Sequence, residues 1–203
     1  MPPIDTRPTL AFIDPGRRKA PFFALLQGAL SDRFRCVYYS RRWVPRGFLR
    51  RAKVEMYPGT WGPRLPPAQP EADGEGLRAA IGAKAFARLG ESIALRQASR
   101  YLHDLERFYD RYDVRAVLVW GGSNLLPSLA VHLARKRGLS VLFTEHGYLP
   151  GTTQVDASGV NFDSSATEAV ASGRAFLSPD AAVDAQLDAI IAGYRAGNPM
   201  RVR

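Results

Sequence analysis

The clearest structural signal in the sequence is Val114-Arg115-Ala116-Val117-Leu118-Val119-Trp120, followed directly by Gly121-Gly122-Ser123-Asn124. An apolar, β-branched run of this length predicts a buried strand, and the two glycines predict a sharp turn after it. Ser123 or Asn124 can cap the next helix, whose apolar pattern runs through Leu133 and ends at Gly138. The segment therefore predicts a strand, a turn and a helix in succession, which is the repeating unit of α/β proteins.

Similar units lie on both sides of this segment. Residues 9–14 and 36–39 read as buried strands that are joined by a helix from Pro21 to about Leu30. Residues 141–144 read as a further buried strand. Because strands that alternate with helices favour a parallel sheet, we expect an α/β fold with a Rossmann-like sheet flanked by helices.

The remaining segments are predicted to be helical or irregular. Apolar residues recur at helical spacing over residues 77–109, where Gly82 and Gly90 indicate either a bend or two packed helices. Residues 41–53 combine arginines with apolar side chains and could form an amphipathic helix. The Pro- and Gly-rich stretch at about 57–76 predicts an irregular loop.

Length and composition fit a globular protein. The chain has 203 residues, 46% of them hydrophobic, which suffices for one well-packed domain. We assign residues 1–165 to a Rossmann-like domain and 166–203 to a C-terminal helical extension. The single cysteine, Cys36, excludes an internal disulfide and is expected to be a small buried side chain. We find no signal-peptide pattern and no apolar run near the roughly 20 residues of a membrane span.

The positive charge is concentrated near the N-terminus. The formal net charge is +9, and residues 1–64 hold 13 Lys and Arg against 4 Asp and Glu. This excess fits an anionic partner such as a phosphate group, a nucleotide, nucleic acid or an acidic membrane surface. A solvated surface without a partner explains the same arginines equally well. Nucleic acid is the least favoured partner, because no RNA- or DNA-binding motif accompanies the charge.

Two loops at the predicted carboxyl ends of strands are candidate binding sites. The turn at Gly121, Gly122, Ser123 and Asn124 exposes backbone N–H groups, which suit an anion or a sugar hydroxyl. The loop after residues 9–14 carries three successive cations, Arg17, Arg18 and Lys19. Both loops should lie at one edge of a parallel sheet, where open α/β folds bind ligands. The alternatives are a simple tight turn and a solvated basic loop.

Glu145 and His146 are the candidate acid–base residues. They follow the strand at residues 141–144, so we expect them in the loop at its carboxyl end, facing the same edge as the other two loops. Imidazole changes protonation near neutral pH and can act as a general base, with a carboxylate in support. The alternative is a pair of structural, hydrogen-bonded side chains. Three scattered histidines and one cysteine give no metal-ligand spacing, so no metal is expected.

The region after this pair resembles a known family. It reads Glu145-His146-Gly147-Tyr148-Leu149-Pro150, then Gln154-Val155-Asp156 and Gly159-Val160-Asn161-Phe162-Asp163-Ser164-Ser165. This pattern is similar to the signature of the bacterial capsule polysaccharide synthesis and export family. Its members are β-Kdo glycosyltransferases, which move Kdo from CMP-Kdo onto a lipid-linked acceptor. Arg18 to Phe23 and Trp120 to Gly122 resemble the family's first loop and a later strand end.

The resemblance implies a fold, a reaction and site residues. It implies one half, on the acceptor side, of a GT-B-type glycosyltransferase, because the His-Pro motif of the family's CMP-binding half does not occur in this sequence. It also implies His146 and Glu145 as catalytic residues, with Tyr148, Asp156 and Asn161 binding substrate or orienting the loop. Two positions depart from the family pattern: His146 stands where an acid is common, and Pro150 where an arginine is common.

The expected partners follow from the same resemblance. They are a glycolipid acceptor, CMP-Kdo as donor substrate without any cofactor, and a second Rossmann-like half or other polysaccharide assembly proteins. The expected location is cytoplasmic, with a peripheral position at the inner face of the inner membrane if the basic surface binds anionic lipid. The alternative function is a non-catalytic binding or scaffold module of a polysaccharide assembly complex.

Overall fold

The computed structural model describes residues 5–15, 18–40, 54–57, 74–147 and 152–173, with scattered positions between 185 and 196. The chain separates into two compact units, Met1–Leu142 and Phe143–Arg203, and each is described by itself. The predicted helix at residues 41–53 and most of the predicted C-terminal helix lie outside the described residues. The assigned domain boundary at residue 165 stays a prediction.

The fold is a mixed α/β sheet flanked by helices, as the sequence predicts. Within the described residues, six strands form one sheet in the order β3-β2-β1-β4-β5-β6. β1 pairs in parallel with both β2 and β4, and β2 pairs in parallel with β3. β6 pairs antiparallel with β5, so the sheet is mostly parallel. The strands are Thr9–Ile13 (β1), Arg35–Tyr39 (β2), Glu55–Met56 (β3), Val114–Trp120 (β4), Ser140–His146 (β5) and Thr153–Asp156 (β6).

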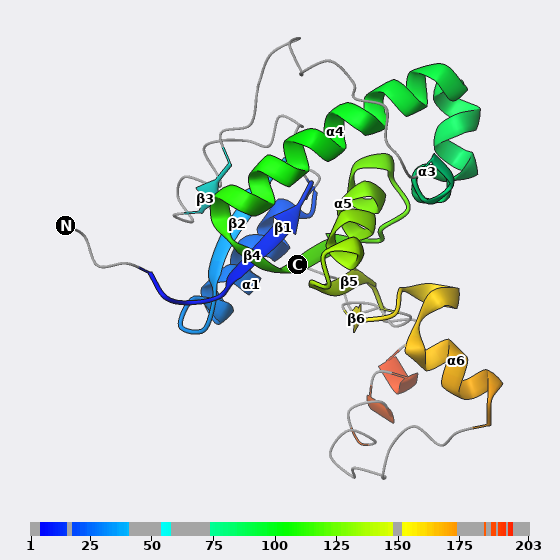
Figure 1. Ribbon diagram of the computed structural model, residues 1–203. Helices are drawn as coiled ribbons and strands as arrows, with labels where there is room; N and C mark the ends of the chain where they lie inside the picture. The colour runs from blue at the N-terminus through cyan, green and yellow to red at the C-terminus, as the bar shows by residue number, and fades with distance from the viewer. Residues whose placement is uncertain are drawn as a thin grey trace. The chain divides into compact units, whose positions relative to one another are not determined.

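Helices cover both faces of the sheet in the first unit (Figure 1). α1, Ala20–Leu30, packs on one face, where Phe23 joins Phe12 and Tyr38 in a fully buried aromatic cluster. α4, Glu91–Tyr112, and α5, Leu125–Lys136, cover the other face and contact each other. β1 is buried throughout, and β4 is buried over most of its length apart from the exposed Arg115, because a strand between two helical layers exposes little of either face.

Two glycines shape the helices before β4, as predicted. α3, Gly74–Leu89, is broken at Gly82, whose φ of 72° and ψ of 155° are not helical. Gly90, with φ of 75°, separates α3 from α4. α3 therefore folds back to contact both α4 and α5.

Several short elements were not predicted. They are β3, β6, the 3-10 turn at Asn161–Asp163 and the helix α6, Ser165–Ala171. α3 begins at Gly74, so the helix includes the last residues of the loop that was predicted at about 57–76.

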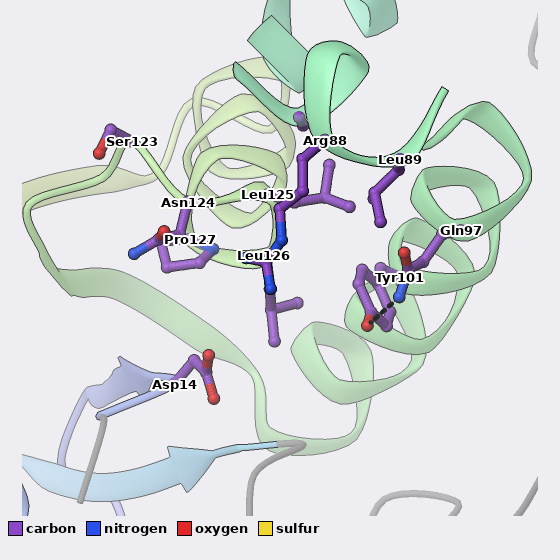
Figure 2. Close-up of a pocket in the computed structure, with 11 residues that line it drawn as sticks. Asp14, Arg88, Leu89, Gln97, Tyr101, Ser123, Asn124, Leu125, Leu126 and Pro127 are labelled. Carbon is purple, nitrogen blue, oxygen red and sulfur yellow. Dashed lines mark hydrogen bonds between the residues drawn. The ribbon is translucent and has the colours of Figure 1, made fainter. Parts of the chain in front are cut away.

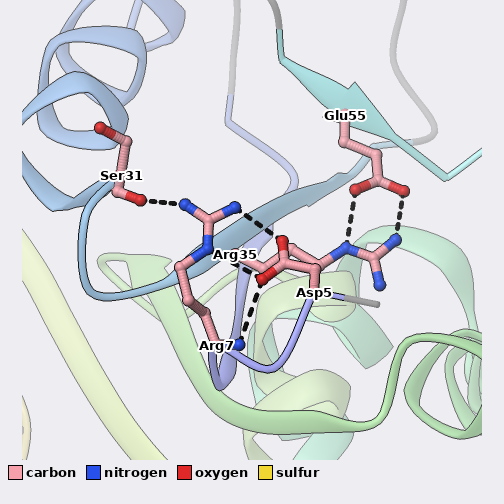
Figure 3. A network of polar contacts seen from close by, with 5 residues as sticks. All are labelled: Asp5, Arg7, Ser31, Arg35 and Glu55. Atoms are coloured by element: carbon pink, nitrogen blue, oxygen red, sulfur yellow. Dashed lines mark hydrogen bonds and ion pairs between the residues drawn. The ribbon is translucent and has the colours of Figure 1, made fainter. Parts of the chain in front are cut away.

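Two arginines of the positively charged N-terminal region form structural ion pairs. Arg35, the first residue of β2, forms a two-pronged contact with Glu55 of β3, with distances of 2.9 and 2.6 Å (Figure 3). Arg7 binds Asp5 and also donates to the carbonyl of Ser31, which ties the segment before β1 to the end of α1. Hydrogen bonds from Arg7 lower the pKa of Asp5 to about 2. Both pairs lie beside the amino ends of β1 and β2, so these arginines are structural.

Cys36 is expected to be unreactive in the native protein. It is buried in β2, and burial raises the pKa of its thiol to about 11, although Arg7 acts against this shift. At neutral pH the thiolate fraction is then roughly 100-fold below that of an ordinary cysteine, before any loss of access is counted. Alkylation by iodoacetamide should be at least that much slower in native protein than in concentrated guanidinium chloride. Equal rates in the two states would contradict the burial of Cys36.

No helix within the described ranges is both long enough and apolar enough to cross a membrane.

Candidate functional site

The order of the strands marks one position in the sheet as special. From β1 the chain builds β2 and β3 on one side, and it then crosses to begin β4 on the other side of β1. Open α/β sheets bind ligands outside the carboxyl ends of the two strands where this reversal occurs. Here those ends are followed by Asp14 after β1 and by the turn Gly121–Asn124 after β4.

A pocket of about 280 Å³ lies at this position, within the first unit (Figure 2). Asp14 lies at one end, and the first turn of α5 forms a wall. α3 and α4 supply the opposite wall. The lining residues are Asp14, Ala85, Arg88, Leu89, Gln97, Tyr101, Ser123, Asn124, Leu125, Leu126 and Pro127. The predicted candidates Ser123 and Asn124 are therefore brought to a pocket, together with residues that the sequence did not mark.

The turn after β4 has the geometry that its two glycines allow. Gly121 and Gly122 have φ of 73° and 87°, a region that side chains rarely enter, and the Gly122 N–H donates to the Trp120 carbonyl at 2.9 Å. Asn124 then occupies the N-cap of α5 without forming a side-chain capping bond. The predicted cap position is confirmed, and the amide of Asn124 lines the pocket instead.

Asp14 is held in an unusual conformation by the end of β2. Its φ is 43°, although it precedes Pro15, and residues before proline normally adopt extended conformations. Such a backbone costs about 1–3 kcal/mol and persists only where the surroundings fix it. Here the Asp14 N–H donates to the Tyr39 carbonyl at 2.7 Å, and the Ser40 hydroxyl donates to Oδ1 at 3.0 Å. The carboxylate is thus positioned from both its backbone and its side chain.

The wall opposite α5 is polar. In α4, the Gln97 side-chain amide donates to the Tyr101 hydroxyl at 2.7 Å, which fixes both groups at the pocket. One turn further along α4, Asp104 is only 2% exposed and accepts hydrogen bonds from the hydroxyls of Tyr39, at 2.6 Å, and Tyr57, at 3.4 Å. This buried network fixes α4 against the end of β2, and so it supports the wall of the pocket.

The basic loop is only partly described. Arg17 lies outside the described residues, and Arg18 is exposed. The Lys19 ammonium lies 3.8 Å from the centroid of the Trp120 ring, a cation–π contact that joins the start of α1 to the end of β4. Neither Arg18 nor Lys19 lines the pocket, so their predicted role in substrate binding stays a prediction.

Glu145 and His146 occupy the end of β5 and not the loop after it, which corrects the sequence-based expectation. They pair with Gln154 and Thr153 of β6, and this antiparallel partner extends the strand beyond the predicted end at residue 144. His146 is exposed and Glu145 is half-buried. The Glu145 carboxylate accepts the backbone N–H of His146 at 2.9 Å. Because neighbours in a strand point to opposite faces, the two side chains do not meet on one face of the sheet.

The residue after this pair must be glycine. Gly147 donates its N–H to the Thr152 carbonyl at 2.9 Å, and a Cβ at residue 147 would lie only 2.0 Å from the Thr152 hydroxyl oxygen. The residue that directly follows β5 therefore packs tightly against Thr152, which directly precedes β6. Tyr148, a predicted binding residue, lies outside the described residues.

Asp156 and Asn161 organise the segment after β6. One oxygen of the Asp156 carboxylate accepts the N–H groups of Ser158 and Gly159, and the other accepts the N–H and hydroxyl of Ser165. Asn161 has a φ of 57°, and its N–H donates to the Gln154 side chain at 3.1 Å. Both residues thus orient the loop by hydrogen bonding, and their contact with a substrate stays a prediction.

The Asp156 carboxylate should make this loop sensitive to acid. Desolvation acts to raise its pKa, but hydrogen bonds from Ser165, Ser158 and Gly159 outweigh it, and the pKa is lowered. The carboxylate therefore stabilises the folded loop above the ordinary aspartate range, near about 4, and this contribution is lost as the pH falls through the folded-state value. An NMR titration of the Ser158 and Ser165 amide shifts should show a midpoint below that range. Asp156→Asn should abolish the transition, whereas a midpoint at the ordinary value would contradict these contacts.

Four polar residues of the pocket were missed: Asp14, Arg88, Gln97 and Tyr101. Asp14 had a usable signal, since it directly follows a buried strand and precedes Pro15 and Gly16. The other three carry no local motif, because they reach the pocket only when α3 and α4 fold back beside α5. Among the described residues, no group of three His, Cys, Asp or Glu side chains is placed to hold a metal ion.

No protein family model and no curated protein matches the sequence. Among solved structures, a crystal structure of UDP-N-acetylglucosamine 2-epimerase matches with a TM-score of 0.44 and 12% sequence identity. The match covers 72% of this chain and 35% of the epimerase chain, so the chain spans about a third of that protein's length. The fold class follows from the strand order and the helical layers, not from this likeness. The α/β, Rossmann-like fold is therefore the established result.

Proposed function

We propose that this chain is a capsule-type glycosyltransferase domain that holds a lipid-linked glycan acceptor during Kdo transfer from CMP-Kdo. The observation that carries the proposal is the pocket between the ends of β1 and β4, where open α/β sheets bind ligands. Its lining combines a carboxylate, a guanidinium, two amides, a phenol and a serine hydroxyl with apolar side chains, a mixture that suits sugar hydroxyls and ring carbons. The sequence resemblance over residues 145–165 supports the choice of Kdo.

The proposed reaction is a substitution at the anomeric carbon of Kdo. The acceptor oxygen forms the new bond, the bond to the phosphate of CMP breaks, and CMP leaves with the electron pair. His146 takes the proton of the acceptor hydroxyl as general base. Glu145 holds the backbone of His146 through the 2.9 Å hydrogen bond to its N–H. A second Rossmann-like half would supply the donor site, and the basic N-terminal third would face an anionic membrane surface on the cytoplasmic side.

The test is a transfer assay on the purified chain. The protein is incubated with CMP-Kdo and a synthetic lipid-linked glycan, alone and together with a separately produced CMP-binding domain. Mass spectrometry should show an acceptor heavier by one Kdo residue in at least one of the two mixtures. Acceptor binding without transfer in either mixture would favour the non-catalytic binding or scaffold module. If neither binding nor transfer were observed in either mixture, both functions would be refuted.

A further inference from the structure

We infer that Asp14 is the residue by which the pocket between β1 and β4 recognises its ligand, and that the recognised group is a single hydroxyl-rich ring. The inference rests on the proposed function in one respect, since it takes this ring to be a pyranose of the glycan acceptor. Asp14 belongs to neither the predicted motif nor the basic loop. It is identified by its place in the fold.

The first argument is the way in which Asp14 is held. Its backbone adopts φ of 43° directly before Pro15, so two local preferences oppose this conformation. Contacts to Tyr39 and Ser40 at the end of β2 nevertheless fix it there. A strained residue that tertiary contacts hold at a ligand position is typical of binding and catalytic sites.

The second argument is the chemistry that faces Asp14. A sugar hydroxyl donates one hydrogen bond and accepts others, so it needs acceptors and donors on different sides. Asp14 supplies acceptors only, and the side-chain amide of Asn124 supplies both donors and an acceptor. Leu125 and Leu126, in the first turn of α5, add backbone N–H groups that have no acceptor within the helix. The pocket can therefore satisfy a hydroxyl in both of its roles.

The third argument is size and the apolar lining. A pocket of about 280 Å³ lies just below the roughly 300–1,000 Å³ of sites for drug-sized ligands, so its volume matches a single ring. Leu89, Leu126 and Pro127 offer apolar surface for the C–H groups of such a ring. The same chemistry is found in a pyranose and in the ribose of a nucleotide, and the experiment must separate the two.

The experiment measures binding by NMR titration of the whole chain with methyl β-galactoside, with methyl glycosides of Kdo and with CMP. We expect at least one methyl glycoside to shift the Asn124 and Leu126 amides. Asp14→Asn should weaken that binding by about 10- to 100-fold, the range for losing a hydrogen bond to a charged group. Asparagine tolerates the left-handed backbone, so this variant should fold. Asp32→Asn, an exposed carboxylate in the turn before β2, is the matched control and should bind normally.

A double-mutant cycle distinguishes recognition from a structural effect. Deoxy versions of the glycoside that binds are titrated against wild type and Asp14→Asn. Removing the sugar hydroxyl that contacts Asp14 should weaken binding to the wild type at least 10-fold. It should hardly change the affinity of Asp14→Asn, because the substitution and the deoxygenation remove the same hydrogen bond. Ser40→Ala, which releases Oδ1, should give a smaller loss of affinity in the same direction.

The outcomes separate this inference from the proposed function. Wild-type-like glycoside binding by Asp14→Asn, or no response to any probe, would overturn the inference even if Kdo transfer is observed. If CMP is the probe that binds, and Asp14→Asn abolishes its binding, then Asp14 does recognise a hydroxyl-rich ring. The identification of that ring as a pyranose of the acceptor would then be wrong. Glycoside binding that depends on Asp14, without any Kdo transfer, would leave the inference standing while the transferase assignment fails.

Discussion

His146→Ala should lower the rate of Kdo transfer by about 100-fold or more, the usual contribution of a general base. The side chain is exposed at the end of β5, so its removal should leave the fold and stability unchanged. Transfer is measured under saturating CMP-Kdo, with circular dichroism to compare the folded states. His103→Ala, at a half-buried position in α4, is the matched control and should retain full transfer.

The neighbouring carboxylate should matter less. Glu145 leaves β5 on the opposite face, and its carboxylate binds the backbone N–H of His146. Glu145→Gln keeps an oxygen for that hydrogen bond, so we expect a loss of transfer below about 10-fold, well under the 100-fold that a missing general base costs. If Glu145→Gln abolished transfer and His146→Ala did not, the roles of the two residues would have to be exchanged.

Asp104→Ala should destabilise the protein by about 3 kcal/mol. The substitution removes an acceptor that two buried phenols share, those of Tyr39 and Tyr57, and each such loss costs about 1–3 kcal/mol. The arrangement is tight, since the rings of Tyr39 and Tyr57 stack at 5.7 Å, and Phe108 packs against both. Burial and the nearby Asp104 also raise the pKa of the Tyr57 phenol, which keeps it a hydrogen-bond donor.

Urea unfolding followed by far-UV circular dichroism measures this loss. A decrease of 3 kcal/mol corresponds to a Tm lower by roughly 10 °C in a protein of this size. Asp110→Ala, on the same helix, removes an exposed ion pair with Arg137 and should cost less than about 1 kcal/mol. Equal losses in the two variants would show that the buried network does not stabilise α4.

The parts of the fold that the sequence predicted are those with strong local patterns. The strand at residues 114–120 and the helix after it are confirmed, because a mostly apolar run, two glycines and a basic helix end all agree. The breaks at Gly82 and Gly90 are confirmed for the same reason, since glycine disfavours helix interiors. The two residues of β3 carry no periodicity, and β6 exists through its pairing with β5, so neither could be read from its own residues.

The candidate site was predicted only in part, because its residues come together through tertiary contacts. Ser123 and Asn124 were found from the turn that contains them. Asp14 has a local signal, because it directly follows a buried strand and precedes Pro15, but its conformation comes from contacts to Tyr39 and Ser40. Tyr101 reaches the pocket through the fold of α4 and has no signature over neighbouring positions. Whether Glu145 and His146 serve the same ligand as this pocket stays a prediction.

The pairing of β1 with β4 has a consequence for the synthesis of the protein. Thr9 pairs with Val114, so the largely apolar strand β1 is synthesised about a hundred residues before its neighbour β4 exists. Until then only β2 can shield one edge of β1, and the other edge is open to aggregation with nascent chains of the same kind. Chaperone demand during translation should therefore peak before residue 114 emerges and fall once β4 is available.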